Sequence, residues 1–127
     1  MNKKIILKVL SFVFMIMLVL SLSACSDSYD GKIEVEIVSL DGDVTYEKSI
    51  KYNDGDKLVD LVSDNFDNVV IEDGMIMAIE DYETPEDWST FLSIYINDEM
   101  SMVGITEIEI SNGMKVSFII TEFSMDF

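Results

Sequence analysis

A single cysteine divides this chain into two parts of very different composition. Cys25 is the only cysteine in the 127 residues, and the 14-residue segment Val9 to Leu22 before it is apolar apart from two serines. Three lysines precede that segment, and no acidic residue occurs before Asp27. A basic start followed by a short apolar segment is typical of a secretory signal. We therefore expect residues 1–24 to be a signal peptide, with the folded part after it.

The residues around the cysteine suggest how the mature chain is held. Leu22-Ser23-Ala24-Cys25 resembles the lipobox of bacterial lipoproteins, in which a branched apolar residue and two small residues precede the cysteine. The resemblance implies that the thiol of Cys25 accepts a diacylglyceryl group, and two or more acyl chains anchor a protein stably to a bilayer. We expect a lipid-anchored protein on the extracytoplasmic face of the cell membrane, with residues 25–31 as a short tether.

The mature chain, residues 25–127, is long enough for one domain, which we place at residues 32–127. An acylated Cys25 leaves no thiol for a disulfide, so this domain must rely on an apolar core.

Charge excludes whole classes of partner. Of eight lysines, three precede Cys25, which leaves five against 25 acidic residues and a net side-chain charge of −20 in the mature chain. Nucleic-acid binding depends on lysine and arginine neutralising phosphates, so we exclude a nucleic-acid partner. The absence of histidine removes histidine general-base catalysis and histidine metal ligands.

Patterns along the chain predict the secondary structure. Apolar residues spaced by three and four predict one helix over residues 57–66, with Asp54 or Asp56 as its cap. The acidic segment 80–87 contains the only proline, and we expect it to be an exposed loop. Apolar runs, several of them alternating with period two, predict strands at residues 32–38, 44–52, 69–71, 75–79, 91–96, 106–110 and 115–123.

Turn signals join several of these strands. Asp41-Gly42-Asp43 and Ser111-Asn112-Gly113 are typical of hairpin turns, and Asn97-Asp98-Glu99 also predicts a turn. Together the elements predict an α+β domain, in which one helix packs on a mostly antiparallel sheet.

The order of these features resembles a family of small exported domains of unknown function in Gram-positive bacteria. That family is related to the C-terminal domain of transcobalamin and intrinsic factor. The resemblance extends from Lys32 to Phe123 and is carried by Asp54 to Leu61, Gly74, Ile76, Ile79, Trp88, Phe91, Tyr95, Asn97, Gly104 and Asn112-Gly113. Two turns depart from the family pattern: Asn97-Asp98 stands where Asn-Gly is usual, and Asn112-Gly113-Met114 where an acidic Gly-Asp turn is usual.

This resemblance implies a β-grasp-like sheet with one helix and kinship to a corrinoid-binding module, although bacterial members need not bind cobalamin. From the residues themselves, Trp88, Phe91 and Tyr95 could form an aromatic platform for a planar ligand or a peptide. Core packing is the favoured reading of the three, because aromatic rings dominate small cores. Asn97 could join the ligand site or simply shape its turn.

We predict no metal site. Calcium binds clustered carboxylates, and acidic residues crowd the turns at 41–43 and 54–56 and the loop at 80–87, but none has EF-hand spacing. Ordinary turn chemistry and a solvated acidic surface are the favoured explanation of these residues. The methionines outside the signal, Met100 and Met102 included, are expected to fill gaps in the core.

We predict no enzymatic activity, because neither a free thiol nor a histidine is available to a nucleophile. Our leading hypothesis is a membrane-anchored binding module for a small ligand such as a corrinoid. The alternative is a structural or protein-interaction subunit of a surface complex without a small-molecule pocket.

Overall fold

A computed structural model describes residues 3–23 and 28–123. Helix α1 (Lys3–Ser23) lies within the predicted signal peptide. In the described part of the chain, no helix combines the length and apolar character needed to cross a membrane. Cys25 lies outside the described residues, so its lipidation stays a prediction.

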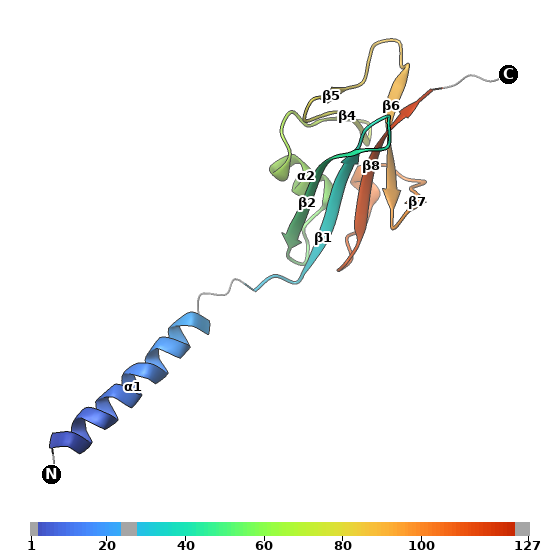
Figure 1. Ribbon diagram of the computed structural model, residues 1–127. Helices are drawn as coiled ribbons and strands as arrows, with labels where there is room; N and C mark the ends of the chain where they lie inside the picture. Colours follow the sequence, from blue (N-terminus) through green and yellow to red (C-terminus); the bar gives the residue numbers. More distant parts are fainter. Residues whose placement is uncertain (1–2, 24–27, 124–127) are drawn as a thin grey trace.

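The domain is built around a five-stranded sheet, in the order β2-β1-β8-β6-β7 (Figure 1). Its strands are β1 (Gly31–Val38), β2 (Val44–Tyr52), β6 (Thr90–Ile96), β7 (Glu99–Met100) and β8 (Lys115–Glu122). The first and last long strands, β1 and β8, run parallel at the centre, and the other neighbours are antiparallel. The α+β prediction, with a mostly antiparallel sheet and one packed helix, is therefore confirmed.

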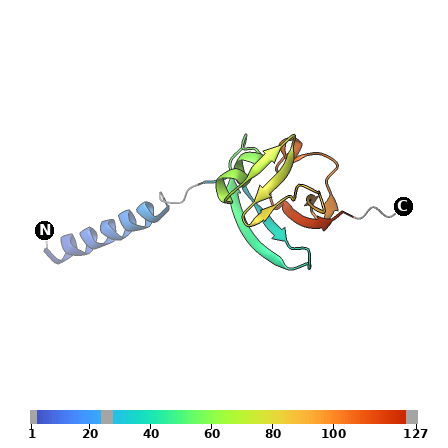
Figure 2. The ribbon, with the colours of Figure 1, turned by 90° about the horizontal axis from the view of Figure 1, so that it is seen from above.

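A second layer covers one face of this sheet. It contains helix α2 (Leu58–Asn65), the 3₁₀ helix η1 (Ile105–Glu107) and a small sheet of β3 (Val70–Glu72), β4 (Met75–Ile79) and β5 (Tyr82–Glu83). Viewed from above, the green and yellow elements lie on one side of β1 and β2 (Figure 2).

Alternation along the strands places the core between the two layers. In β1, Ile33, Val35 and Ile37 are buried, and residues between them face the other side of the sheet. Leu58, Leu61 and Val62 supply the buried face of α2. All core residues lie between Ile33 and Phe118, and α1 contributes none among its described side chains. The domain therefore has its own apolar core, as expected for a chain without disulfides.

Two element predictions are wrong. Residues 106–110 alternate like a strand but form η1 and an extended segment, because no neighbouring strand pairs with them in the described chain. The turn at Asn112-Gly113 consequently closes no hairpin; the backbone N–H of Gly113 donates to the carbonyl oxygen of Lys32 at 2.8 Å instead. Segment 80–87 is not wholly a loop, since β5 pairs with β4.

The predicted cap of α2 is also wrong. Lys57 occupies the N-cap position and makes no side-chain capping bond. The Oδ2 atom of Asp56 accepts the backbone N–H of Asn53 at 2.9 Å, so this carboxylate closes the preceding turn rather than the helix. Asp54 is likewise held away from the helix, because its backbone N–H donates to Oδ2 of Asp30 at 2.6 Å.

Candidate functional site

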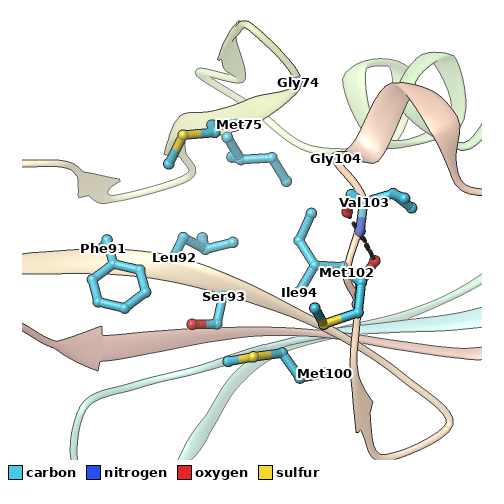
Figure 3. A pocket seen from close by; sticks show the side chains of 12 residues that line it. Gly74, Met75, Phe91, Leu92, Ser93, Ile94, Met100, Met102, Val103 and Gly104 are labelled. Atoms are coloured by element: carbon cyan, nitrogen blue, oxygen red, sulfur yellow. Dashed lines mark hydrogen bonds between the residues drawn. The ribbon is translucent and has the colours of Figure 1, made fainter.

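An apolar groove runs beside the edge of β6, and we call it the β6 groove (Figure 3). It has a volume of about 270 Å³ and lies between the start of β4, strand β6 and the segment from β7 to Gly104. Its lining residues are Gly74, Met75, Ile76, Phe91, Leu92, Ser93, Ile94, Met100, Ser101, Met102, Val103 and Gly104.

Several apolar side chains at this groove are exposed to solvent. Met102 is 92% exposed and Met100 55% exposed, and Val103 and Met75 are each more than two-fifths exposed. Scattered exposed apolar residues are ordinary, but a contiguous group around a concavity marks a binding surface. The prediction that methionines fill the core is wrong for Met75, Met100 and Met102, although Met114 is buried in the core.

A serine fixes the segment that carries two of these side chains. The Oγ atom of Ser101 donates to the carbonyl oxygen of Val103 at 2.8 Å and accepts the backbone N–H of Val103 at 3.2 Å. The backbone N–H of Ser101 also donates to the carbonyl oxygen of Ile94 at 2.8 Å. These bonds hold residues 101–103 against β6. Met102 and Val103 therefore lie at the groove on a turn that hydrogen bonds fix in place (Figure 3).

Two glycines close one end of the groove. The backbone N–H of Ile105 donates to the carbonyl oxygen of Gly74 at 2.9 Å, which joins the segment after Met102 to the β3–β4 turn. A Cβ atom at position 104 would lie 2.8 Å from the same oxygen, so only glycine permits this approach. Gly74 itself has φ +79°, a left-handed conformation that favours glycine. The resemblance to the exported family includes both glycines, and the structure shows that they touch.

The surroundings of the groove are acidic. Residues 58–114 contain 14 acidic residues and neither lysine nor arginine. Glu72 and Asp73 directly precede Gly74, and Asp98 and Glu99 directly precede Met100. All four are exposed. Asp98 is paired with Lys115 at 3.3 Å; Glu72, Asp73 and Glu99 have no ion pair with any described residue. The rim therefore favours a ligand that carries positive charge.

Among the described residues, Lys115 is the lysine that forms an ion pair with a carboxylate of this rim. Its Nζ lies 3.3 Å from Oδ1 of Asp98 and 3.5 Å from Oε1 of Glu36. The hydrogen bond to Asp98 and the nearby charge of Glu36 raise the pKa of Lys115. This ammonium stays charged and does not neutralise the other rim carboxylates.

The four predicted ligand residues do not share one concavity. Only Phe91 lines the β6 groove, and none of the grooves formed by residues 28–123 that we describe brings Trp88, Phe91 and Tyr95 together. Phe91 makes an edge-to-face contact with Phe123, with ring centroids 6.3 Å apart. None of the three aromatic residues belongs to the core, and Trp88 is 43% exposed.

Trp88 sits on a constrained turn. It has φ 56°, in the left-handed region, and its backbone N–H donates to the carbonyl oxygen of Pro85 at 3.0 Å. The Oδ1 atom of Asp87 accepts the backbone N–H of Ser89 at 3.0 Å. Bonds from the backbone and the side chain of Ser89 lower the pKa of Asp87. The turn thus explains the backbone around Trp88 without a ligand.

Asn97 shapes its turn and also joins two strands. Asn97 and Asp98 both have positive φ, at 50° and 68°, as the two central residues of a tight hairpin require. The backbone N–H of Lys115 donates to Oδ1 of Asn97 at 2.9 Å, and the N–H of Asn97 donates to the carbonyl oxygen of Lys115 at 2.9 Å. Its amide oxygen therefore already has a partner within the fold.

The acidic turns do not assemble a metal centre in the described residues, where no group of three or more histidine, cysteine, aspartate or glutamate side chains converges. A second, polar groove of about 540 Å³ is lined by residues 52–57 and 106–110. Its Asp56 is committed to the bond with Asn53 described above.

The sequence gives a partial signal for the β6 groove. Met100 and Met102 are separated by a serine and follow directly after the Asn97-Asp98-Glu99 turn, where the sequence predicts no long strand. That placement favours exposure, but residue type alone does not reveal that Met75, 25 positions earlier, lies at the same groove.

Comparison with known proteins supports the fold. No curated protein matches this chain. A solved structure from Ruminococcus gnavus, described as a candidate metal binding protein, matches with a TM-score of 0.58 and 13% sequence identity. The match covers 75% of this chain and 100% of that one, and at this identity it shows a shared fold alone. Residues 55–122, more than half of the chain, match the family described as a domain of unknown function, DUF4430, and the chain belongs to that family.

Proposed function

We propose that this protein is a lipid-anchored binding module that captures a small ligand in the β6 groove through the ligand's apolar groups. The observation that carries the proposal is the group of exposed apolar side chains, led by Met102 and Met100, around a concavity of an otherwise acidic domain. Exposed apolar surface is costly in water, and burying it against a ligand recovers about 25 cal/mol for each Å². Flexible thioethers also adapt to ligands of varied shape.

Anchoring through Cys25 is the second half of the proposal. The signal-like residues 1–24 and the lipobox-like Leu22 to Cys25 support it. An anchored domain with a six-residue polar segment after Cys25 would begin within about 20 Å of the bilayer. This arrangement suits a protein that captures a ligand for use at the cell surface.

A corrinoid is one ligand that the resemblance to transcobalamin-related domains suggests. At about 270 Å³ the β6 groove lies just below the range of ligand pockets, about 300–1,000 Å³. It would therefore hold one edge or substituent of a corrin ring and leave the rest outside. We propose no metal ligand, because the likeness to a described metal binding protein concerns the fold alone.

We propose binding rather than catalysis because the hydroxyl group that β6 presents at the groove is already hydrogen-bonded within the fold. Ser93 is the only hydroxyl on the part of β6 that lines the groove, and its Oγ is hydrogen-bonded to Oγ1 of Thr121 at 3.0 Å. No histidine exists to activate a hydroxyl group.

The alternative, a subunit of a surface complex, is favoured by one observation. The edge of β6 beside the groove is paired with β7 only at Tyr95 and Ile96. An open strand edge is a template for pairing with another chain.

A calorimetric titration of the full chain in detergent micelles with cobinamide tests the small-ligand proposal. We compare wild type with the double variant Met100→Gln/Met102→Gln, which keeps side-chain length and charge but makes the groove polar. The matched control is Leu40→Gln/Val44→Gln, at exposed apolar residues of the β1–β2 hairpin. Binding that is lost in the groove variant and kept in the control supports the proposal. Binding that is equal in both variants would place the ligand elsewhere.

A further inference from the structure

The backbone of β6 directs the polar groups of alternate residues toward the groove. In an antiparallel pair, alternate residues direct their N–H and C=O groups to the same neighbour. Bonds from Phe123 to Ser89 and from Asn97 to Lys115, each 2.9 Å, show that the odd-numbered positions face β8. Leu92 and Ile94 therefore face the opposite edge, where Ser101 already donates to the carbonyl oxygen of Ile94.

Leu92 is left without a strand partner on this edge within residues 28–123. Strand β7 ends its pairing at Tyr95, and β4 belongs to a separate sheet. Beyond Leu92 the edge is bounded at Thr90, whose Oγ1 is hydrogen-bonded to the hydroxyl of Tyr82 at 3.3 Å. The open edge is therefore centred on Leu92, between Thr90 and the bonded Ile94, with room for an extended segment of about three residues at 3.3 Å each.

Side chains on both sides of this edge suit an extended chain. Leu92 and Ile94 point to one side of β6, toward Met75 and Val103, while Phe91 and Ser93 point to the other side (Figure 3). Successive side chains of an added strand would alternate between the same two sides. Apolar side chains would meet Met75 and Val103 on one side, and Phe91 and Met100 on the other.

The acidic charge of the groove rim favours basic residues in such a segment. The two segments that enclose the groove begin with Glu72-Asp73 and Asp98-Glu99, and the lysine that pairs with Asp98, Lys115, is shared with Glu36. An acidic peptide would be repelled by this rim, and a basic one attracted.

We infer that the β6 groove takes an extended peptide segment that bears lysine or arginine among apolar residues, and that this segment joins β6 as an added strand through Leu92. The inference rests on the proposed function, because it names the ligand class of the same groove. Main-chain hydrogen bonds to Leu92 would supply affinity, and the apolar walls and acidic rim would supply selectivity.

The test uses a fluorescein-labelled hexapeptide of alternating lysine and valine with blocked ends. Fluorescence anisotropy follows its binding to the full chain in nonionic detergent micelles, with empty micelles subtracted. Two further peptides separate the contributions: one with glutamate in place of lysine, and one with the lysine–valine sequence but a methyl group on every backbone nitrogen. Methylation removes the N–H donors of both peptide edges and leaves the side chains and the charge in place.

Strand addition predicts that the methylated peptide binds about tenfold more weakly, and that the glutamate peptide does not bind. Glu72→Gln/Asp73→Asn should weaken binding of the lysine peptide, as should Met100→Gln/Met102→Gln, while Leu40→Gln/Val44→Gln should leave it unchanged. Equal binding of methylated and unmethylated peptides would overturn strand addition.

Failure of the inference and failure of the proposed function give different results. If no peptide binds but cobinamide binding is lost in Met100→Gln/Met102→Gln, the groove is a small-ligand site and the peptide inference is wrong. If neither peptide nor cobinamide responds to that variant, both are wrong.

Discussion

At Gly104 a missing side chain allows two segments to meet. Its φ of −73° and ψ of 167° are accessible to any residue, so glycine is required here for space rather than for conformation. The space is occupied by Gly74, whose carbonyl oxygen would lie 2.8 Å from an added Cβ. Because that contact involves two backbones, no side chain can rotate away to relieve it.

Gly104→Ala should therefore lower the free energy of unfolding by about 1–3 kcal/mol, the usual cost of overpacking. Urea denaturation measures the change. Gly42→Ala serves as a contrast, because position 42 has φ +89° and open space around it. That variant should cost stability through its backbone alone and leave ligand binding in the groove unchanged, whereas Gly104→Ala should weaken both. Wild-type binding and stability in Gly104→Ala would contradict the contact.

Asp87 gives the molecule a pH-dependent contact. Its carboxylate accepts the N–H of Ser89, and this bond lowers its pKa below the ordinary value of 3.8. A lowered pKa means that the stabilisation is present above the ordinary value and is lost as pH falls through the folded-state pKa.

We expect Asp87→Asn to melt at a lower temperature than wild type near neutral pH. Scanning calorimetry should show the difference shrinking as pH falls below 3.8, where the wild-type carboxyl becomes neutral too. A difference that stays constant across this range would mean that the charge of Asp87 contributes nothing.

At the scale of elements, helix α2 depends on packing rather than on its ends. Its N-cap residue, Lys57, makes no side-chain bond to the first turn, and a cation there opposes the helix dipole. The buried face of Leu58, Leu61 and Val62 holds the helix in place.

Lys57→Ser should raise the free energy of unfolding by about 0.5–2 kcal/mol, because a serine at the N-cap accepts a first-turn N–H. Lys57→Ala is the control, since it removes the same cation and adds no cap. Chemical denaturation of both variants separates the two effects. Equal stability of the serine and alanine variants would show that the cap does not form.

The boundaries of a strand could be predicted from the sequence where strand formation is the only explanation of its apolar pattern. Val44–Tyr52 is the predicted second strand, and Met75–Ile79 is the predicted fourth, because alternation or an apolar run bounded by turns leaves few alternatives. The strand predicted at 106–110 is wrong because Ile108 and Ile110 pack against the core from a segment that pairs with no described strand. Burial alone produced the alternation that a strand would show.

The groove could not be predicted for a related reason. Its walls come from β4, β6 and the segment after β7, and their approach depends on sheet order and on the Gly74–Gly104 contact. Neither is visible in local patterns. The sequence alone therefore predicts that the methionines lie in the core, which is the usual place for such side chains.

For the whole molecule, strand order explains both the core and the open edge. Parallel pairing of β1 with β8 places the two most buried strands at the centre and leaves β6 next to a two-residue strand, β7. The groove therefore lies at the edge of the main sheet, and a separate segment before the domain carries the proposed anchor.

Cys25→Ala should abolish anchoring. Cells that express the wild-type chain should incorporate radiolabelled palmitate into it, and the protein should partition into detergent; the variant should do neither. Ser26→Ala is the matched control and should behave like wild type. Palmitate incorporation into the variant would contradict lipidation at this residue.

The measurement that tests the central claim most directly is methyl NMR of the chain labelled with ¹³C at its methionine methyl groups. Titration with cobinamide, and separately with the lysine–valine peptide, reports where a ligand lies. If the β6 groove is the binding site, the signals of Met75, Met100 and Met102 shift, while that of the buried Met114 stays in place. Shifts confined to other methionines, or none with either ligand, would contradict the account.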